Sequence, residues 1–505
     1  MSPVLLPLFV AVPMFAAALL VLFRGPVIGR IVLTATPLLV LAGAIGLLIT
    51  HRSQPVIAHS VGGYVEGLAI PFVSDSFTAL MLAVTALSTL AAVLFMIRTR
   101  EDRYRFVPPL ILLLVAGVDG ALLTGDLFNL FVWVEVMLMP SYALIAVTGS
   151  WRRLGIGRMF VLVNLLTSTI LLIGVGMVYG TAGTVNLAEL AGAGAKNPVT
   201  AAALGIVLLA LAVKAGVVPV HGWLPRSYPA TSGGVMGLFS ALHTKVALYA
   251  IFRIIAVTFD GRLPYDVVAL VLVIVTMLVG AIATAGVRRI RAALGFQMVS
   301  GVGHILIGVV LMGQVALGAG ILYMIHHIVT MSALVLAIGA VEHIYGSGKL
   351  DHIRGLARRE PWVATVLALG FLSLVGLPPT SGLWGKIGLM TASGTDGGVE
   401  GYLLIAAIIV ASIASMMSLQ KVWRMLAWGK PMESYRPDDE TMGRGAPVAL
   451  PVDVRIPVSL LLPSTLMIAV SVAIFVGVGV LLPEVNRAAG SLVDIPTYVK
   501  AVLGR

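Results

Sequence analysis

Apolar runs long enough to cross a lipid bilayer recur along this whole chain, separated by short polar segments. A membrane-spanning helix needs about 20 predominantly apolar residues. Hydrophobic residues make up 59% of the sequence and charged residues only 11%, which is far from the composition of a water-soluble domain. A membrane barrel would show short segments of alternating polarity, and the sequence lacks them. The pattern therefore predicts an all-α polytopic membrane protein.

The apolar runs place about fourteen transmembrane spans along the sequence. They cover residues 4–23, 29–50, 72–97, 107–125, 127–149, 158–180, 199–220, 233–258, 265–286, 293–312, 316–344, 361–391 (interrupted), 402–427 and 456–482. The pair 107–125 and 127–149 has almost no linker between its members. No basic residue precedes the first run, so we interpret it as a retained span rather than a signal peptide.

The distribution of Lys and Arg among the loops predicts the orientation of the chain. Loops after odd-numbered spans carry 23 of these residues, whereas loops after even-numbered spans and the C-terminal tail carry 6. Because cytoplasmic loops are enriched in Lys and Arg, we expect the loops 98–106 and 429–455 to be cytoplasmic and both termini to lie outside. The net charge of +11 is spread over these loops, so it does not indicate nucleic-acid binding.

Of the 33 Lys and Arg residues, four are not counted with the loops and the tail and lie well within predicted spans or near a span end: Lys214, Lys245, Arg253 and Lys386. Arg253 is near the end of its span, and we expect its long side chain to reach the interface. The three lysines lie far from span ends. Isolated charges at that depth are costly and indicate a functional site. The alternative is that each lysine reaches the interface or is satisfied by a backbone carbonyl.

Two of the predicted spans are interrupted beside a lysine. Pro219 comes five residues after Lys214, and Pro378 and Pro379 precede Lys386 in the string GLPPTSGLWGK. Proline removes a backbone donor and clashes with the preceding turn, so both helices should be broken. Many transporters place an ion site near the bilayer midplane at such breaks.

Acidic and histidine side chains add candidate proton carriers. Glu135 has apolar or aromatic neighbours on both sides, whereas Asp126 stands at a junction of two spans and is as well explained by helix capping. The histidines that fall within core spans are His243, His304, His326 and His327. Histidine titrates near neutrality and can relay protons, although a lone buried histidine is often only hydrogen-bonded. His326 and His327 are about 100° apart on a helix.

The charged positions hint at an internal repeat. The pairs Glu135/His304, Lys214/Lys386 and Lys245/Lys421 are separated by 169, 172 and 176 residues, with five spans between the members of each pair. An odd number of spans inverts the topology, so we expect two inverted five-helix repeats, spans 4–8 and 9–13. This divides the chain into residues 1–100, 101–262, 263–428 and 429–505.

Several strings resemble the antiporter-like subunits shared by respiratory complex I and Mrp-type multisubunit cation/proton antiporters. The strings are TGDLFNLFVWVEVMLMPSYALIAV, KAGVVPVHGWLPRSYPATSGG, the HTK at 243–245, IHHIVTMSALVL and GLPPTSGLWGK. They follow the order used in that family and cover roughly spans 3 to 13. The first string is most similar to the D-type subunits of Mrp antiporters.

The resemblance implies a fourteen-helix fold with two inverted five-helix units and a path of buried charged residues along the membrane plane. It implies that Glu135, Lys214, Lys245 and Lys386 take part in proton transfer. The family often has a lysine after the paired histidines, where this chain has Met331. A thioether cannot carry a proton, so His326, His327, His304 or water must bridge Lys245 and Lys386.

These observations predict a proton-translocating subunit of an Mrp-type Na⁺/H⁺ antiporter in a bacterial plasma membrane, with other membrane subunits as partners. We expect no cofactor, no metal site and no catalytic residues. The chain has no cysteine to ligate a cluster and no phosphate-binding loop of the form GxxxxGK[ST]. The alternatives are a proton-pumping subunit of complex I or a related redox complex, and a structural subunit without transport.

Overall fold

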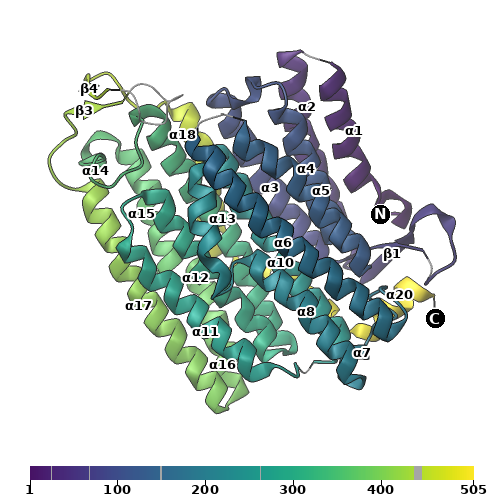
Figure 1. The fold of residues 1–505 in the computed structure, drawn as a ribbon. Coiled ribbons are helices and arrows are strands. Elements are labelled where there is room, and N and C mark those ends of the chain that lie inside the picture. Colours follow the sequence, from purple (N-terminus) through teal and green to yellow (C-terminus); the bar gives the residue numbers. More distant parts are fainter. Residues whose placement is uncertain (24, 68, 148–150, 262, 437–445, 505) are drawn as a thin grey trace.

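The computed structural model describes residues 1–505 except 24, 68, 148–150, 262, 437–445 and 505. Four residues that entered the count of basic residues lie outside the described residues: Arg24, Arg262, Arg444 and Arg505. The middle of the predicted loop 429–455 also lies outside them. The helices pack side by side into one bundle (Figure 1). Both chain ends lie near β1 and α20, whereas β3, β4 and α14 lie at the opposite end.

The described residues form the following elements in chain order. The helices are α1 (Leu8–Leu22), α2 (Pro26–Thr50), α3 (Ser76–Arg98), α4 (Val107–Leu123), α5 (Leu127–Ala146), α6 (Trp151–Ala182), α7 (Ala193–Lys196), α8 (Pro198–Ala215), α9 (Leu224–Ser227), α10 (Gly233–Thr258), α11 (Asp266–Ala283), α12 (Ile290–Leu311), α13 (Gly313–Tyr345), α14 (Leu356–Arg359), α15 (Pro361–Val375), α16 (Gly382–Asp396), α17 (Val399–Ala427), α18 (Val458–Val476), α19 (Val478–Val493) and α20 (Ile495–Leu503). The strands are β1 (Val56–Ser60), β2 (Pro71–Asp75), β3 (Ser434–Tyr435) and β4 (Val448–Ala449).

The predicted spans agree with the helices. Among the described residues, 12 helices are long and apolar enough to cross a membrane, and Val107–Leu123 and Pro361–Val375 are shorter apolar helices. These follow the order of the predicted spans, so the helical membrane fold is confirmed. The closely spaced pair is two helices, α4 and α5. Asp126 caps α5, because its carboxylate accepts a hydrogen bond from the Asn129 amide at 2.7 Å.

One departure from the all-α prediction lies between α2 and α3. β1 and β2 form an antiparallel hairpin in which Val56 is opposite Asp75. The third span therefore begins at Ser76, where Asp75 caps the helix by accepting a hydrogen bond from the Thr78 amide, and not at residue 72. The predicted span begins at residue 72 because two apolar residues of β2 closely precede the apolar helix, although the polar residues 74–76 separate them from it.

The two helices at the centre of the bundle are α10 and α13, whose apolar windows are 100% buried. By contrast, those of α2 and α17 are 33% and 39% buried, which leaves wide apolar faces for lipid or partner chains. α13 packs against α3, α10, α12, α15, α16 and α18. A charge on α10 or α13 is therefore far from solvent and must find its partners inside the protein.

Candidate functional site

Lys214 lies in the last turn of α8, where that helix stops. Gly216 adopts the left-handed conformation that ends helices, with φ at +86°. Pro219 follows and cannot donate a helical hydrogen bond, so the predicted break is confirmed. Lys214 is 2% exposed, and its Nζ donates to Oδ1 of Asn164 on α6 at 3.3 Å.

Glu135 lies half-buried on α5, and among the described residues it makes no direct ion pair with Lys214 at the 4.0 Å limit. Asn164 takes the place of the carboxylate beside Lys214. The two charges still attract through space. Oε1 of Glu135 is shielded from solvent and has no hydrogen-bond partner in the described structure.

His243 links the Glu135 helix to the central helix α10. Its Nε2 is 2.9 Å from Oγ of Ser141 on α5, and that hydroxyl also donates to the Met137 carbonyl. The imidazole stacks on Phe239 with ring centroids 4.3 Å apart. Position and orientation of this histidine are therefore fixed from two helices.

Lys245 is 0% exposed and lies in the middle of α10. Its Nζ donates to the Ser240 carbonyl at 2.8 Å and to Oγ1 of Thr244 at 3.1 Å. Within the part of the chain that the structure describes, no carboxylate lies within 4.0 Å of this nitrogen. A buried lysine held by neutral oxygens can lose its proton without leaving an unpaired carboxylate behind.

The second break repeats the arrangement of the first. α15 ends at Gly376, whose φ is +93°, and α16 resumes at Gly382 after Pro378 and Pro379. Nζ of Lys386 donates to the Val375 carbonyl at 2.8 Å and to Oγ of Ser412 at 2.7 Å. A Cβ on Gly376 would lie 2.6 Å from Cδ of Lys386, so glycine is required for both the backbone conformation and the lysine.

Three of the predicted histidines form one buried cluster around Tyr323. His304 on α12 stacks on Tyr323 at 5.0 Å, and His326 packs edge-on at 5.1 Å. His327 lies further away, at 6.5 Å. Gly301 on α12 makes room for it, because a Cβ there would lie 2.0 Å from the His327 ring.

Packing places these groups in series through the bundle. α10 contacts α8 on one side and α13 on the other, and α13 contacts both α12 and α16. The candidate groups therefore form a series from the break after α8 to the break before α16, in the order Lys214, Lys245, the histidine cluster and Lys386. Met331 is fully buried one turn after His327, so the histidines hold the only titratable nitrogens described on that part of α13.

Sequence reasoning missed the neutral groups that hold the charged ones. These are Asn164, Ser141, Tyr323, Thr330, Ser373, Ser381, Ser412 and Ser471. Asn164 could have been found, since it is the one amide in the apolar run of α6. The hydroxyl residues could not have been found from the sequence, because serine and threonine are common in apolar helices and carry no periodic signal.

The prediction for Arg253 was wrong. Its side chain does not reach the interface but is 5% exposed, and it forms an ion pair with Asp75 at 2.7 Å. The hairpin supplies that carboxylate deep inside the protein, which the sequence did not reveal. Burial raises the pKa of Asp75, but the Arg253 charge and its hydrogen bonds more than offset this and hold the pKa below its ordinary value.

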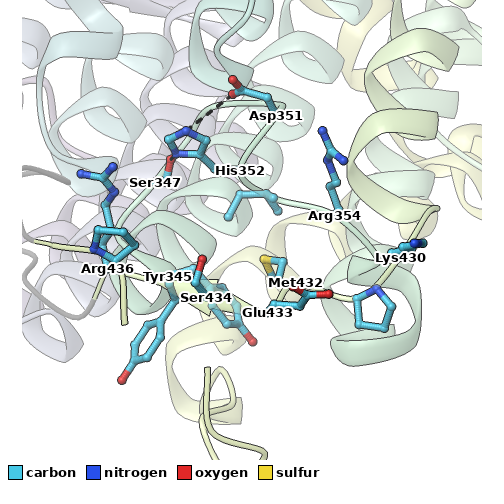
Figure 2. A pocket seen from close by; sticks show the side chains of 14 residues that line it. Tyr345, Ser347, Asp351, His352, Arg354, Lys430, Met432, Glu433, Ser434 and Arg436 are labelled. Carbon is cyan, nitrogen blue, oxygen red and sulfur yellow. Dashed lines mark hydrogen bonds and ion pairs between the residues drawn. The ribbon is translucent and has the colours of Figure 1, made fainter. Parts of the chain in front are cut away.

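A pocket of about 500 Å³ opens at the end of the molecule that carries β3 and β4. Figure 2 shows Arg354 and Lys430 on one side of it and Arg436 on the other, with His352 directed toward Asp351. Tyr345 forms part of its wall. Because Tyr345 is 18 residues beyond His327 on one helix, the pocket is about 27 Å from the histidine cluster and separate from it.

Comparisons with known proteins agree with this geometry. The family of membrane proteins described as "NADH:quinone oxidoreductase/Mrp antiporter, TM" matches residues 124–420. A protein of Alkalihalophilus pseudofirmus, named as the D-type subunit of a Na(+)/H(+) antiporter, is 30% identical over 87% of this chain and 90% of its own length. The chain belongs to this family. The family match contains all the proposed proton-transfer residues, from Glu135 to Lys386, and excludes the hairpin.

Solved structures extend the likeness of this family member to nearly the whole chain. A chain of the Mrp complex from Dietzia sp. DQ12-45-1b is 42% identical, with a TM-score of 0.93 and 99% of both chains covered. A second sequence relative, the D-type subunit of a Na(+)/H(+) antiporter from Bacillus subtilis, is 30% identical over 87% of this chain and 89% of its own length. A chain of respiratory complex I from Thermus thermophilus is 22% identical, with a TM-score of 0.78 over 97% of this chain and 99% of that one, and shares the fold.

Proposed function

We propose that this chain is the proton-translocating subunit of a multisubunit Na⁺/H⁺ antiporter of a bacterial plasma membrane, driven by the proton motive force. It is a multi-pass transporter subunit rather than an enzyme. The observation that carries the proposal is the series of buried cations across the bundle, two of which stand at broken helices. The 42% identity to a chain of an Mrp complex supports the antiporter over a redox complex.

The series works through electrostatic coupling. Lys214, Lys245 and Lys386 bind protons where neutral oxygens are their nearest partners. A proton that arrives on one lysine weakens the hold of its neighbour on its own proton, because like charges repel strongly in a medium of low dielectric constant. Glu135 favours the charged form of Lys214. Four histidines lie between the lysines and relay protons from one to the next, including past the position of Met331: His243, His304, His326 and His327.

Antiport by the assembled complex in membrane vesicles tests this proposal. The chain is expressed with its neighbouring membrane subunits in a bacterial host that lacks its own Na⁺/H⁺ antiporters. Everted vesicles should then release protons when Na⁺ is added, and omission of this chain should abolish the signal. Small antiporter subunits should co-purify with it. Recovery of quinone-binding or iron–sulfur subunits instead, with no Na⁺-dependent proton movement, would favour the redox complex.

A further inference from the structure

Nδ1 of His326 belongs to a closed ring of five short polar contacts. The other members are four fully buried hydroxyl groups, Thr330, Ser373, Ser381 and Ser471. Around the ring the distances are 2.9 Å from His326 to Ser381, 2.7 Å to Ser471, 3.3 Å to Ser373, 2.9 Å to Thr330 and 3.2 Å back to His326. Side chains from α13, α15 and α18 and from the break before α16 thus form one ring with this imidazole nitrogen.

Counting the protons in this ring assigns the tautomer of His326. Each hydroxyl has one proton to donate. If Nδ1 accepts from Ser381, the four hydroxyl protons make four consecutive hydrogen bonds that end at Nδ1. No proton is left over, and the fifth contact, between Nδ1 and Oγ1 of Thr330 at 3.2 Å, carries no hydrogen bond. If Nδ1 carries a proton, it cannot accept, and one hydroxyl proton has no partner in the ring. Nε2 of His326 has no hydrogen-bond partner among the described residues in either tautomer, so the hydroxyl ring decides between them. A proton on Nδ1 would strand a hydroxyl proton in addition to the Nε2 lone pair, and because each buried unpaired group is costly, the ring favours neutral His326 with its proton on Nε2.

His304 has the opposite arrangement. Its Nδ1 is 2.8 Å from the Ser300 carbonyl oxygen, and a carbonyl can only accept, so Nδ1 carries the proton. Nε2 of neutral His304 therefore holds a free lone pair, and it is buried without a hydrogen-bond partner among the described residues. Ser300 is itself anchored, since its hydroxyl donates to the Met277 carbonyl. Both histidines lie against Tyr323.

We propose that the two histidines have different roles. His304 carries the proton toward Lys386, whereas His326 stays neutral and acts as a positioning residue. The inference rests on the proposed function and narrows it, because it takes His326 out of the set of proton carriers. A proton that binds to Nε2 of His304 forms an imidazolium whose Nδ1–H is still held by the Ser300 carbonyl. When the proton leaves from the same Nε2 toward neutral Lys386, the original tautomer is restored. No other bond has to change.

Several titratable groups surround this pair. They are Tyr323 and His327 on α13, Lys386 on α16, and Lys245, which faces His327 from α10. α15 presents the Ser373 hydroxyl to His326, and α18 presents the Ser471 hydroxyl to Ser373. Because Lys386 acts on both histidines, a proton can settle on His304 most readily while Lys386 is neutral, which fits a donor that precedes the lysine.

Two single substitutions distinguish the histidines. His304→Asn keeps an amide that can donate to the Ser300 carbonyl but has no titratable nitrogen. His326→Asn keeps an oxygen near the position of Nδ1 that can accept from the hydroxyl ring. In vesicles from pH 6 to 9, we expect His304→Asn to lower antiport by at least about a hundredfold, the scale of general acid–base transfer. His326→Asn should lower it by about fivefold at most, the scale of one hydrogen bond, without moving the pH profile.

The possible outcomes separate this inference from the proposed function. Equal losses in both variants, or a shifted pH profile in His326→Asn, would overturn this difference in roles and leave the antiporter proposal standing. Wild-type antiport in His304→Asn would also overturn it. Wild-type antiport in both variants would remove the histidine relay from the proposed function as well. Fluxes are compared at equal amounts of assembled complex.

The ring can be tested without changing either histidine. Ser471→Ala opens the ring at a position that does not touch His326. Ser464→Ala is the matched control, because Ser464 is equally buried on α18 but donates only to the Leu461 carbonyl. We expect about a fivefold loss of antiport in Ser471→Ala, recovery in Ser471→Thr, and wild-type antiport in the control. Equal antiport by Ser471→Ala and Ser464→Ala would contradict a positioning role for the ring.

Discussion

At the scale of single residues, each buried lysine is held by neutral oxygens rather than by a carboxylate. Lys214 donates a hydrogen bond to Asn164, Lys245 to the Ser240 carbonyl, and Lys386 to the Val375 carbonyl. A permanent ion pair would hold the proton too firmly, because breaking a buried pair leaves an uncompensated charge. Neutral acceptors orient each ammonium group and still let it deprotonate. Residue chemistry therefore favours proton exchange over stable ion binding.

Glu135 offers the first prediction at this scale. Its carboxylate lies beyond ion-pair distance of Lys214, so their attraction is less than about 4 kcal/mol at an effective dielectric constant of 20. Glu135→Ala should lower antiport by at least about tenfold, which corresponds to 1.4 kcal/mol, and Glu135→Asp should retain more activity. Vesicle assays at matched expression measure both. Full antiport by Glu135→Ala would exclude this carboxylate from the path.

Asn164 gives a second prediction, which the sequence did not suggest. Asn164→Leu removes the acceptor of Lys214 and leaves a buried ammonium group with one partner fewer. We expect about a fivefold to tenfold loss of antiport. Asn129→Leu on α5 is the control, because Asn129 binds Trp133 on its own helix and does not contact Lys214. Similar losses in both variants would assign Asn164 a structural role.

At the scale of elements, the broken helices and the hairpin depend on different kinds of sequence signal. Pro219, Pro378 and Pro379 predicted both breaks, because proline acts locally on its own helix. The fate of Arg253 could not be predicted, because its partner Asp75 is 178 residues away in the sequence and belongs to an unrecognised hairpin. The hydroxyl ring around His326 could not be predicted either, because its members come from elements that are far apart in the sequence. Local signals are legible in one sequence, whereas pairings between distant elements are not.

The Asp75–Arg253 ion pair predicts how stability responds to pH. The pKa of Asp75 is lowered in the folded protein, so the pair stabilises the fold above the unfolded pKa of about 3.9 and loses its effect as pH falls through the folded pKa. Asp75→Asn should cost about 3–5 kcal/mol at pH 7, with a smaller difference from wild type below pH 4. Thermal unfolding of the detergent-solubilised protein measures this.

Glu484 supplies the control for that experiment. It pairs with Arg52 and Arg487 near the surface, where ion pairs contribute only about 0–1 kcal/mol. Glu484→Gln should therefore change the unfolding temperature little across the same pH range. If Asp75→Asn proves no more destabilising than Glu484→Gln, the buried pair is not a major support of the hairpin.

At the scale of the whole molecule, the bundle places both chain ends at the end opposite β3 and β4 (Figure 1). This agrees with an even number of spans. From the asymmetry of 23 to 6 basic residues we predict that the end with β3 and β4 faces the cytoplasm. Single cysteines at Ser347 and Ser53 should then react with an impermeant thiol reagent from the inside and the outside, respectively. Labelling of both from outside would refute the orientation.

The central claim is that the buried lysines carry the transported protons. Na⁺-dependent proton movement in everted vesicles tests it directly when Lys245→Ala is compared with Lys421→Ala. Lys245 is fully buried at the centre of the path, whereas Lys421 is exposed on α17 and donates to the Ala285 carbonyl. We predict that Lys245→Ala assembles but shows only background antiport, while Lys421→Ala transports like the wild type. Wild-type antiport by Lys245→Ala would contradict the account.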